Sequence, residues 1–249
     1  MAVLTIAARE FRATFNSTIG WLVLAAFLFL NGVFFLMWLT YFAEASAQFS
    51  GGAYGDVQLL LSEQLFAPFY GNVATILLFI CPALSMRMFA EERSQRTLEL
   101  LLTSPISTAE IVLGKFLGAL GFVTVLLAGL LYGPLLLWWW STPDIGALVT
   151  GNLALFLVAA STIAIGALFS SFTDNQITAL VVTVSVCLAL YIIGAVGDQD
   201  SIWGQISILS HIDDLFLGGI RLSDVSYFVG LIGVFLFATH QKVESYRWS

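Results

Sequence analysis

The stretch EERSQRTLELLLTSPISTAEIVLGK, residues 91–115, is the most charged part of a very apolar chain. Of the 249 residues, 59% are hydrophobic and only 10% are charged. These 25 residues nevertheless hold seven charged side chains, in a chain that has nine basic and 16 acidic residues in total. Because charged side chains are costly in hydrocarbon, such a stretch between long apolar runs is typical of a loop that joins two membrane spans.

The composition around this stretch indicates an integral membrane protein. A soluble domain is about 25% charged and less than half apolar, whereas the mean hydropathy of this chain is +0.94. Apolar runs of about 20 residues, long enough to cross about 30 Å of hydrocarbon, recur along the whole sequence. The sequence therefore predicts an all-α membrane protein, a single domain over residues 1–249, with six transmembrane helices at 19–42, 71–90, 116–140, 148–170, 177–197 and 225–240.

The distribution of Lys and Arg predicts the orientation of these spans, because basic residues in short loops favour the cytoplasm. With both termini inside, only Arg221 lies outside, and eight basic residues lie inside: Arg9, Arg12, Arg87, Arg93, Arg96, Lys115, Lys242 and Arg247. The net charge of −7 then comes from acidic outer loops and does not indicate a nucleic-acid partner. We expect a multi-pass protein of the inner (cytoplasmic) cell membrane with both termini in the cytoplasm.

Two segments outside the spans have helical apolar patterns. Within residues 1–18, apolar side chains recur every four positions from Val3 to Phe15, which predicts a helix lying flat on the inner surface; a disordered tail is the alternative. The outer segment 198–224 repeats apolar residues every three or four positions over about 15 residues, too few to cross the bilayer. We expect either a re-entrant helix or a helix on the outer surface, with the stripe Trp203, Ile206, Leu209, Ile212 and Phe216.

Residues 91–103 have the pattern of a short helix that leads into the third span. Leu98, Leu101 and Leu102 form one apolar stripe, and Glu92 precedes Arg96 by four positions, the favourable order for an ion pair. Ser104 and Pro105 end this helix, and STAE at 107–110 then predicts a capping box at the start of the next one. The helix is either an ordinary amphipathic connector or a docking surface for a cytoplasmic protein.

These residues also resemble a known family. EERSQRTLELLLTSPISTAEIVLGKFLGAL (91–120) is similar to the signature region of type-2 permeases of ATP-binding-cassette (ABC) transporters, especially the gliding-motility and nitrous-oxide-maturation permeases. LFSSFTDNQITALV (168–181) resembles the second cytoplasmic loop of that family. ILSHIDDLFLGGIRLSDVSYFVGLIGVFLFAT (208–239) resembles its outer re-entrant segment and last span. One departure is Arg96, which stands where the family often has a glycine.

The resemblance implies the permease subunit of an ABC exporter, with residues 91–104 as the coupling helix on a separate ATPase. The implied contacts with the ATPase are Glu91, Glu92, Arg93, Arg96, Thr97, Glu99, Leu100 and Ser104, with Phe172, Thr173 and Asp174 in a lesser role. Two ATPase subunits would bind ATP and Mg, so we expect no cofactor in this chain. A second permease copy or a homologous permease, membrane lipid and an extracytoplasmic accessory membrane protein are the other expected partners. The outer stripe at 203–216 would form an exit gate.

The sequence lacks the residues that two other kinds of function require. Gly114 and Lys115 are followed by Phe116 and lack the earlier glycine of a P-loop, so we expect no ATPase activity in this chain. No acidic residue lies at the centre of a predicted span, which disfavours a proton-coupled carrier. The alternative to an exporter subunit is a non-transporting membrane scaffold or channel that relays signals with an associated ATPase.

A few polar and small residues within or beside the spans have open roles. Asn31, midway along the first span, either forms an interhelical hydrogen bond or lines a pathway. The pairs Gly114/Gly118 and Gly129/Gly133 would allow close helix packing by the third span. TDNQ at 173–176 predicts a second capping box, which would start the fifth span.

Overall fold

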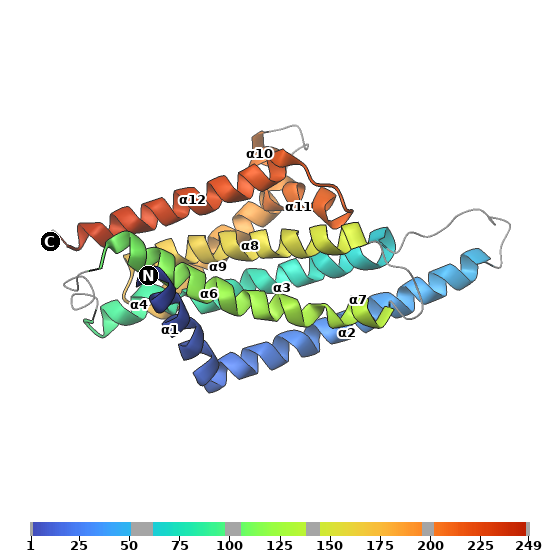
Figure 1. The fold of residues 1–249 in the computed structure, drawn as a ribbon. Coiled ribbons are helices and arrows are strands. Elements are labelled where there is room, and N and C mark those ends of the chain that lie inside the picture. The colour runs from blue at the N-terminus through green and yellow to red at the C-terminus, as the bar shows by residue number, and fades with distance from the viewer. Residues whose placement is uncertain (1, 51–61, 98–105, 138–144, 196–201, 248–249) are drawn as a thin grey trace.

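A computed structural model describes residues 2–50, 62–97, 106–137, 145–195 and 202–247, which form helices and short turns without a strand in these ranges (Figure 1). The helices are α1 (Ala2–Asn16), α2 (Thr18–Ser50), the π-helical turn η1 (Ser62–Phe66), α3 (Ala67–Ser85), α4 (Arg87–Ser94), α6 (Thr108–Leu130), α7 (Tyr132–Leu137), α8 (Ile145–Phe172), α9 (Gln176–Ile192), the 3-10 turn η2 (Ile193–Ala195), α10 (Ile202–Ile206), α11 (Ile208–Phe216) and α12 (Leu222–Ser245). The predicted all-α class is confirmed.

Within the described ranges, five helical units are long and apolar enough to cross a membrane: Thr18–Ala47, Glu63–Ser94, Thr108–Leu137, Ile145–Phe172 and Leu222–Ser245. The remaining predicted span, the fifth at 177–197, corresponds to α9, which has 17 residues and continues into η2. At 1.5 Å per residue, α9 and η2 together reach about 30 Å, enough for the hydrocarbon core. The first two spans extend beyond their predicted bounds at 42 and 71, because α2 continues to Ser50 and η1 begins at Ser62.

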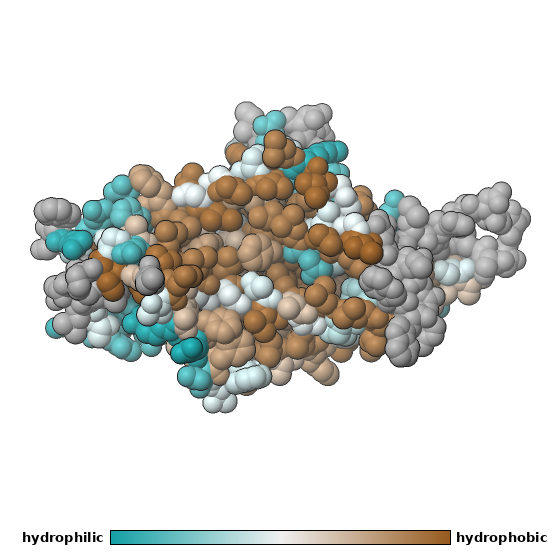
Figure 2. All heavy atoms as spheres, in the orientation of Figure 1, coloured by the Kyte–Doolittle hydropathy of each residue, from teal (hydrophilic) through white to brown (hydrophobic). Residues whose placement is uncertain are grey.

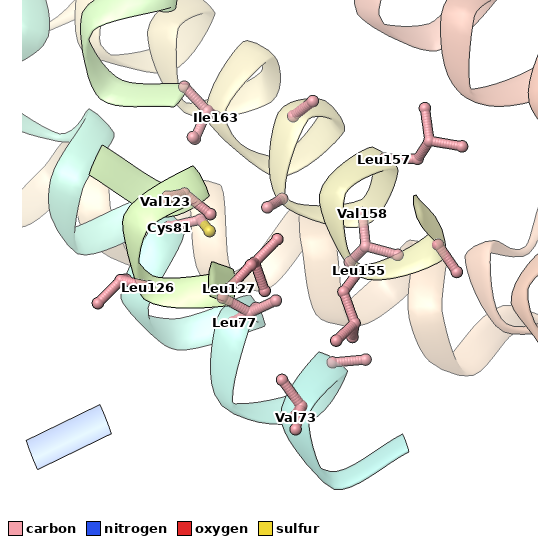
Figure 3. Close-up of a cluster of buried hydrophobic side chains, with 14 of the residues drawn as sticks. Val73, Leu77, Cys81, Val123, Leu126, Leu127, Leu155, Leu157, Val158 and Ile163 are labelled. Atoms are coloured by element: carbon pink, nitrogen blue, oxygen red, sulfur yellow. The ribbon is translucent and has the colours of Figure 1, made fainter. Parts of the chain in front are cut away.

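Helix α8 forms the centre of the bundle and packs against α3, α6, α9 and α12 (Figure 1). In the most apolar part of α8, 78% of the residues are buried, against 17% in the corresponding parts of α2 and α12. Figure 3 shows where its Leu155, Val158 and Ile163 meet side chains of α3 and α6, among them Leu77 and Leu127. The apolar faces that α2 and α12 leave open are suited to lipid.

Both chain termini lie at the same end of the bundle as α4, the start of α6 and the turn between α8 and α9 (Figure 1). Hydrophilic side chains gather at this end, whereas the middle of the same face is hydrophobic (Figure 2). We call this end of the bundle the charged end. It brings together the N-terminal helix and the loops that the six-span topology predicts on one side of the membrane.

Helix α1 packs across the first half of α6, at glycines that the sequence marked for close helix packing. A Cβ atom at Gly114 would lie 2.7 Å from the Cβ of Ile6, and one at Gly118 would lie 2.6 Å from the Cβ of Glu10. Such contacts are too short, so only glycine allows this approach. Gly129 and Gly133 similarly receive side chains of α2. The alternative of a disordered N-terminal tail is wrong; a position of α1 on the membrane surface stays a prediction.

Candidate functional site

Helix α4 is shorter than the helix predicted over 91–103, because it ends at Ser94. Arg96 has a left-handed backbone with φ of 56°. Its N–H donates to the carbonyl oxygen of Arg93 (3.1 Å), and the N–H of Thr97 donates to that of Glu92 (2.9 Å). These two bonds form a Schellman motif, which closes a helix and favours glycine at the left-handed position. The predicted stripe Leu98, Leu101 and Leu102, and the predicted contacts Glu99, Leu100 and Ser104, lie outside the described residues.

This geometry would suit a glycine at position 96. A left-handed conformation costs an L-residue about 1–2 kcal/mol, part of which the greater chain entropy of glycine offsets. We therefore expect Arg96→Gly to stabilise the fold by about 0.5–1 kcal/mol, seen as a small rise in Tm of the purified protein. Gln95→Gly is the matched control. Gln95 has φ of −85°, a conformation that does not favour glycine, so this variant should be less stable than the wild type. A fall in Tm for Arg96→Gly would contradict the motif.

The predicted ion pair between Glu92 and Arg96 is wrong for the same reason. Arg96 has left the helix, so it does not lie one turn beyond Glu92. Glu92 turns inward instead, and its Oε1 lies 2.8 Å from Nζ of Lys115 on α6. Only 19% of the Glu92 side chain is exposed, so this residue belongs to the interior of the charged end rather than to its outer surface.

Lys115 is a buried cation that joins three helices. Its side chain is 4% exposed, and Nζ lies 3.3 Å from Oε1 of Glu10 on α1 as well as beside Glu92 on α4. Nζ also lies 5.6 Å from the centre of the Phe89 ring. Burial opposes ionisation of Glu10, but Lys115 and Arg9 outweigh it and hold the pKa of this carboxyl below its usual value. The contact between Lys115 and Glu10 was not predicted from the sequence, because 105 positions separate the two residues.

A serine of α8 holds the junction between α3 and α4. The Oγ atom of Ser170 accepts hydrogen bonds from the N–H groups of Phe89 and Ala90, both at 3.0 Å, and donates to the carbonyl oxygen of Met86 at 2.9 Å. In a continuous helix the Ala90 N–H would donate directly to the Met86 carbonyl. A hydroxyl inserted into this ladder is a recognised cause of a bend, and it ties the bend to α8.

Arg93 connects α4 with two other parts of the charged end. Its guanidinium lies 3.0 Å from Oδ1 of Asp174, in the turn between α8 and α9, and donates to the carbonyl oxygen of Ser171 (3.1 Å) at the end of α8. It also donates to Oη of Tyr246 (2.8 Å), just beyond α12, and lies 4.8 Å from the centre of that ring. The structure thus brings together Arg93 and Asp174, two predicted site residues that the sequence alone did not pair.

The turn between α8 and α9 lies beside α4, and the residue that caps α9 differs from the predicted one. Asn175 caps α9, because its Oδ1 accepts from the N–H groups of Ile177 (2.9 Å) and Thr178 (3.5 Å). Thr173 accepts from the N–H of Asn175 instead, so the predicted capping box at 173–176 is wrong. The box at 107–110 is confirmed: Ser107 accepts from the N–H of Glu110, whose carboxylate accepts from the N–H of Ser107.

An exposed surface remains at the charged end after these contacts are made. We call it the docking face; it comprises the exposed residues Gln95, Arg96, Thr97, Phe172 and Asp174. Phe172 is 54% exposed, unusual for an aromatic side chain next to charged residues. Arg93 and Asp174 hold the two parts of this face together through their ion pair.

The outer segment consists of two helices rather than one continuous amphipathic helix. The chain breaks at Ser207, whose Oγ accepts from the N–H of Leu209 (3.2 Å) and so caps α11. Of the predicted stripe, Trp203 and Ile206 before the break are 56% and 39% exposed, whereas Ile212 and Phe216 after it are buried. The buried face of α11 is Ile208, Ile212, Leu215 and Phe216. Phe216 reaches Tyr70 of α3, with 5.7 Å between ring centres.

Asn31 is fully buried in α2. Its Nδ2 donates to the carbonyl oxygen of Phe27 (2.7 Å) in the same helix, and its Oδ1 has no hydrogen-bond partner in the described part of the chain. The predicted interhelical hydrogen bond is therefore absent among the described residues. The role in a pathway stays a prediction.

Comparison with known proteins identifies a family for most of the chain. The sequence model of the family described as "ABC-2 family transporter protein" matches residues 4–197, well over half of the 249 residues. The match includes α1, α4, Lys115 and the turn between α8 and α9. No curated protein matches the chain.

Proposed function

Because the chain belongs to the ABC-2 transporter family, and so is a membrane permease component of an ABC transporter, we propose that its docking face couples export to ATP hydrolysis by a separate subunit. Permeases of this family are transmembrane subunits that associate with ABC ATPases and are not themselves catalytic. The subtype and the substrate are not part of the proposal. The observation that carries it is the docking face itself, an exposed surface of charged, polar and aromatic side chains at the end of an otherwise apolar bundle.

The contacts behind the docking face support a coupling role. An ATPase can bias the permease only through contacts that differ between its nucleotide states, and those contacts must reach elements that move together. Ser170 ties α4 to α8, Arg93 ties it to the turn before α9 and to the end of α12, and Lys115 ties it to α1 and α6. A displacement of the docking face would therefore reach five helices directly.

The complete transporter would contain two ATPase subunits, which bind ATP and Mg, and a second copy of this chain or a homologous permease. The segment of α10 and α11 would act as the outer gate, with Ile208, Ile212, Leu215 and Phe216 holding it against the bundle. Membrane lipid surrounds the apolar belt, and an extracytoplasmic accessory protein would contact the outer end.

A paired substitution tests the docking face. We expect Arg96→Ser with Phe172→Ser to reduce co-purification of the ATPase about tenfold or more, because exposed Arg and aromatic side chains are frequent anchors of protein interfaces. Arg221→Ser with Leu222→Ser is the matched control, since these residues are 69% and 84% exposed and the outer gate segment precedes them. Undiminished ATPase binding by the first pair would refute the assignment. ATP-dependent export by the reconstituted complex separates a transporter from a scaffold.

Cysteine labelling tests the orientation. We propose that the charged end faces the cytoplasm, because eight of nine basic residues lie on that side of the six-span topology. In intact cells, an impermeant thiol reagent should label Leu222→Cys but not Ser94→Cys, and both should react after permeabilisation. The native Cys81 and Cys187 are buried, so they should stay silent. Labelling of Ser94→Cys in intact cells would reverse the topology.

A further inference from the structure

A half-open pocket of about 460 Å³ lies at the charged end between α1, α4 and α6. Its lining is amphipathic. The apolar lining comprises Leu84, Met88, Ala119 and Phe122, and the charged lining comprises Glu10, Arg87, Glu91, Glu92 and Lys115. Gln95 and Thr97 of the docking face also line this pocket, which therefore adjoins that face.

Two groups of opposite charge face the pocket without a partner. Arg87 makes no ion pair or hydrogen bond within the described part of the chain, although it lies at the start of α4 close to the apolar bundle. Oε2 of Glu92 is buried and also lacks a hydrogen-bond partner there, since Lys115 binds the other carboxylate oxygen. A buried charged atom without a partner is costly, which favours a ligand that supplies the missing contact.

The charges in the pocket select the kind of ligand. Three carboxylates, Glu10, Glu91 and Glu92, face two cations, Arg87 and Lys115, so the lining carries one net negative charge at neutral pH. This balance disfavours a purely anionic ligand, and the unpaired Arg87 disfavours a simple cation. A zwitterion satisfies both groups, with its anion on Arg87 and its ammonium on Glu92.

We propose that this pocket binds the headgroup of a phospholipid that carries a primary amine, of the phosphoethanolamine type. The phosphate accepts hydrogen bonds from Arg87, and the ammonium donates to Oε2 of Glu92. The apolar lining contacts the glycerol and the first part of the acyl chains. The site lies where a headgroup would, at the end of the hydrophobic belt (Figure 2). This inference rests on the membrane-spanning fold and does not require the proposed coupling to an ATPase.

The bound lipid would fix the relative positions of three helices. Arg87 and Glu92 belong to α4, while α1 contributes Glu10 to the lining and α6 contributes Lys115 and Phe122. A headgroup that bridges these elements holds α4 in place together with the contact between Lys115 and Glu92. Occupancy would therefore regulate how firmly the docking face is attached to the bundle.

A lipid series tests the proposal with the purified full chain. The detergent-solubilised protein is exchanged into nanodiscs of phosphatidylethanolamine, phosphatidylcholine or phosphatidylglycerol with the same acyl chains, and then tested for Tm and, by native mass spectrometry, for retained lipid. Phosphatidylcholine keeps the charge but lacks N–H donors, and phosphatidylglycerol lacks the amine. We expect phosphatidylethanolamine to be retained about tenfold more than either and to give the highest Tm.

Arg87→Gln should abolish this preference, because it removes the phosphate contact without breaking a contact that the described chain makes. Arg12→Gln is the matched control on the exposed face of α1, and it should keep the preference. Equal retention of the three lipids by the wild-type chain, or an unchanged preference in Arg87→Gln, would overturn the proposal. A preference for phosphatidylglycerol would overturn it as well. If an ATPase partner stabilises the chain through Arg87 while the lipids do not differ, the pocket is a protein contact instead.

Discussion

Replacement of Ser170 by Ala is expected to destabilise the protein by about 2–4 kcal/mol, because one hydroxyl satisfies three backbone groups. Without it, the N–H groups of Phe89 and Ala90 and the carbonyl of Met86 lose their partner in a buried junction. The helix can recover one bond by straightening, since Ala90 can then donate to Met86 directly. Such a change would swing α4 away from α8 and move the docking face, so ATPase activity and export should become uncoupled.

Thermal unfolding of the purified variant and the ATPase rate of the reconstituted complex measure the two effects. Ser185→Ala is the control: the Ser185 hydroxyl donates to the carbonyl of Val181 in its own helix, so its loss leaves no unpaired group. If Ser170→Ala has the same Tm and coupling as Ser185→Ala, the bend does not depend on the inserted hydroxyl.

Local features of this protein were predictable from the sequence, because the interacting atoms lie close together in it. The spans could be predicted from the apolar runs, because each transmembrane helix is one continuous apolar segment of the chain. The capping box at Ser107 and Glu110 was predictable because both groups lie within one turn. The end of α4 was missed, because arginine is a good helix former in general and does not mark position 96 as a left-handed residue.

The contacts that assemble the charged end could not be predicted in this way. Ser170 and Phe89 are 81 positions apart, and Glu10 and Lys115 are 105 apart, so no periodic pattern connects them. A serine near a helix end or a lysine beside an apolar run is commonly a surface residue, so neither Ser170 nor Lys115 stands out in the sequence. The outer stripe was predicted only in part for a related reason: Ile212 and Phe216 are buried, but Trp203 and Ile206 are exposed, because the helix breaks at the cap of Ser207 between the two pairs.

The buried Lys115 gives the second large effect. Lys115→Met keeps the length of the side chain but removes a cation that is 4% exposed between two carboxylates. Glu92 then loses its ion pair, while Glu10 keeps Arg9 at 3.1 Å. Removal of one partner of a buried pair costs about 3–5 kcal/mol, because the remaining charge stays in a poorly solvated place. We expect a marked fall in Tm and weaker attachment of α1 to the bundle, measurable by proteolysis at the N-terminus.

A second set of substitutions, which removes the carboxylates together with the lysine, distinguishes this electrostatic cause from a loss of packing. The triple variant Glu10→Gln, Lys115→Met and Glu92→Gln removes the charges together, and well-packed neutral groups can replace a buried ion pair at little cost. It should therefore regain most of the stability that Lys115→Met loses. Arg247→Met removes a cation from the exposed C-terminal region and should behave like the wild type. If the triple variant is no more stable than Lys115→Met, the lysine acts through its aliphatic packing, and the two carboxylates do not depend on its charge.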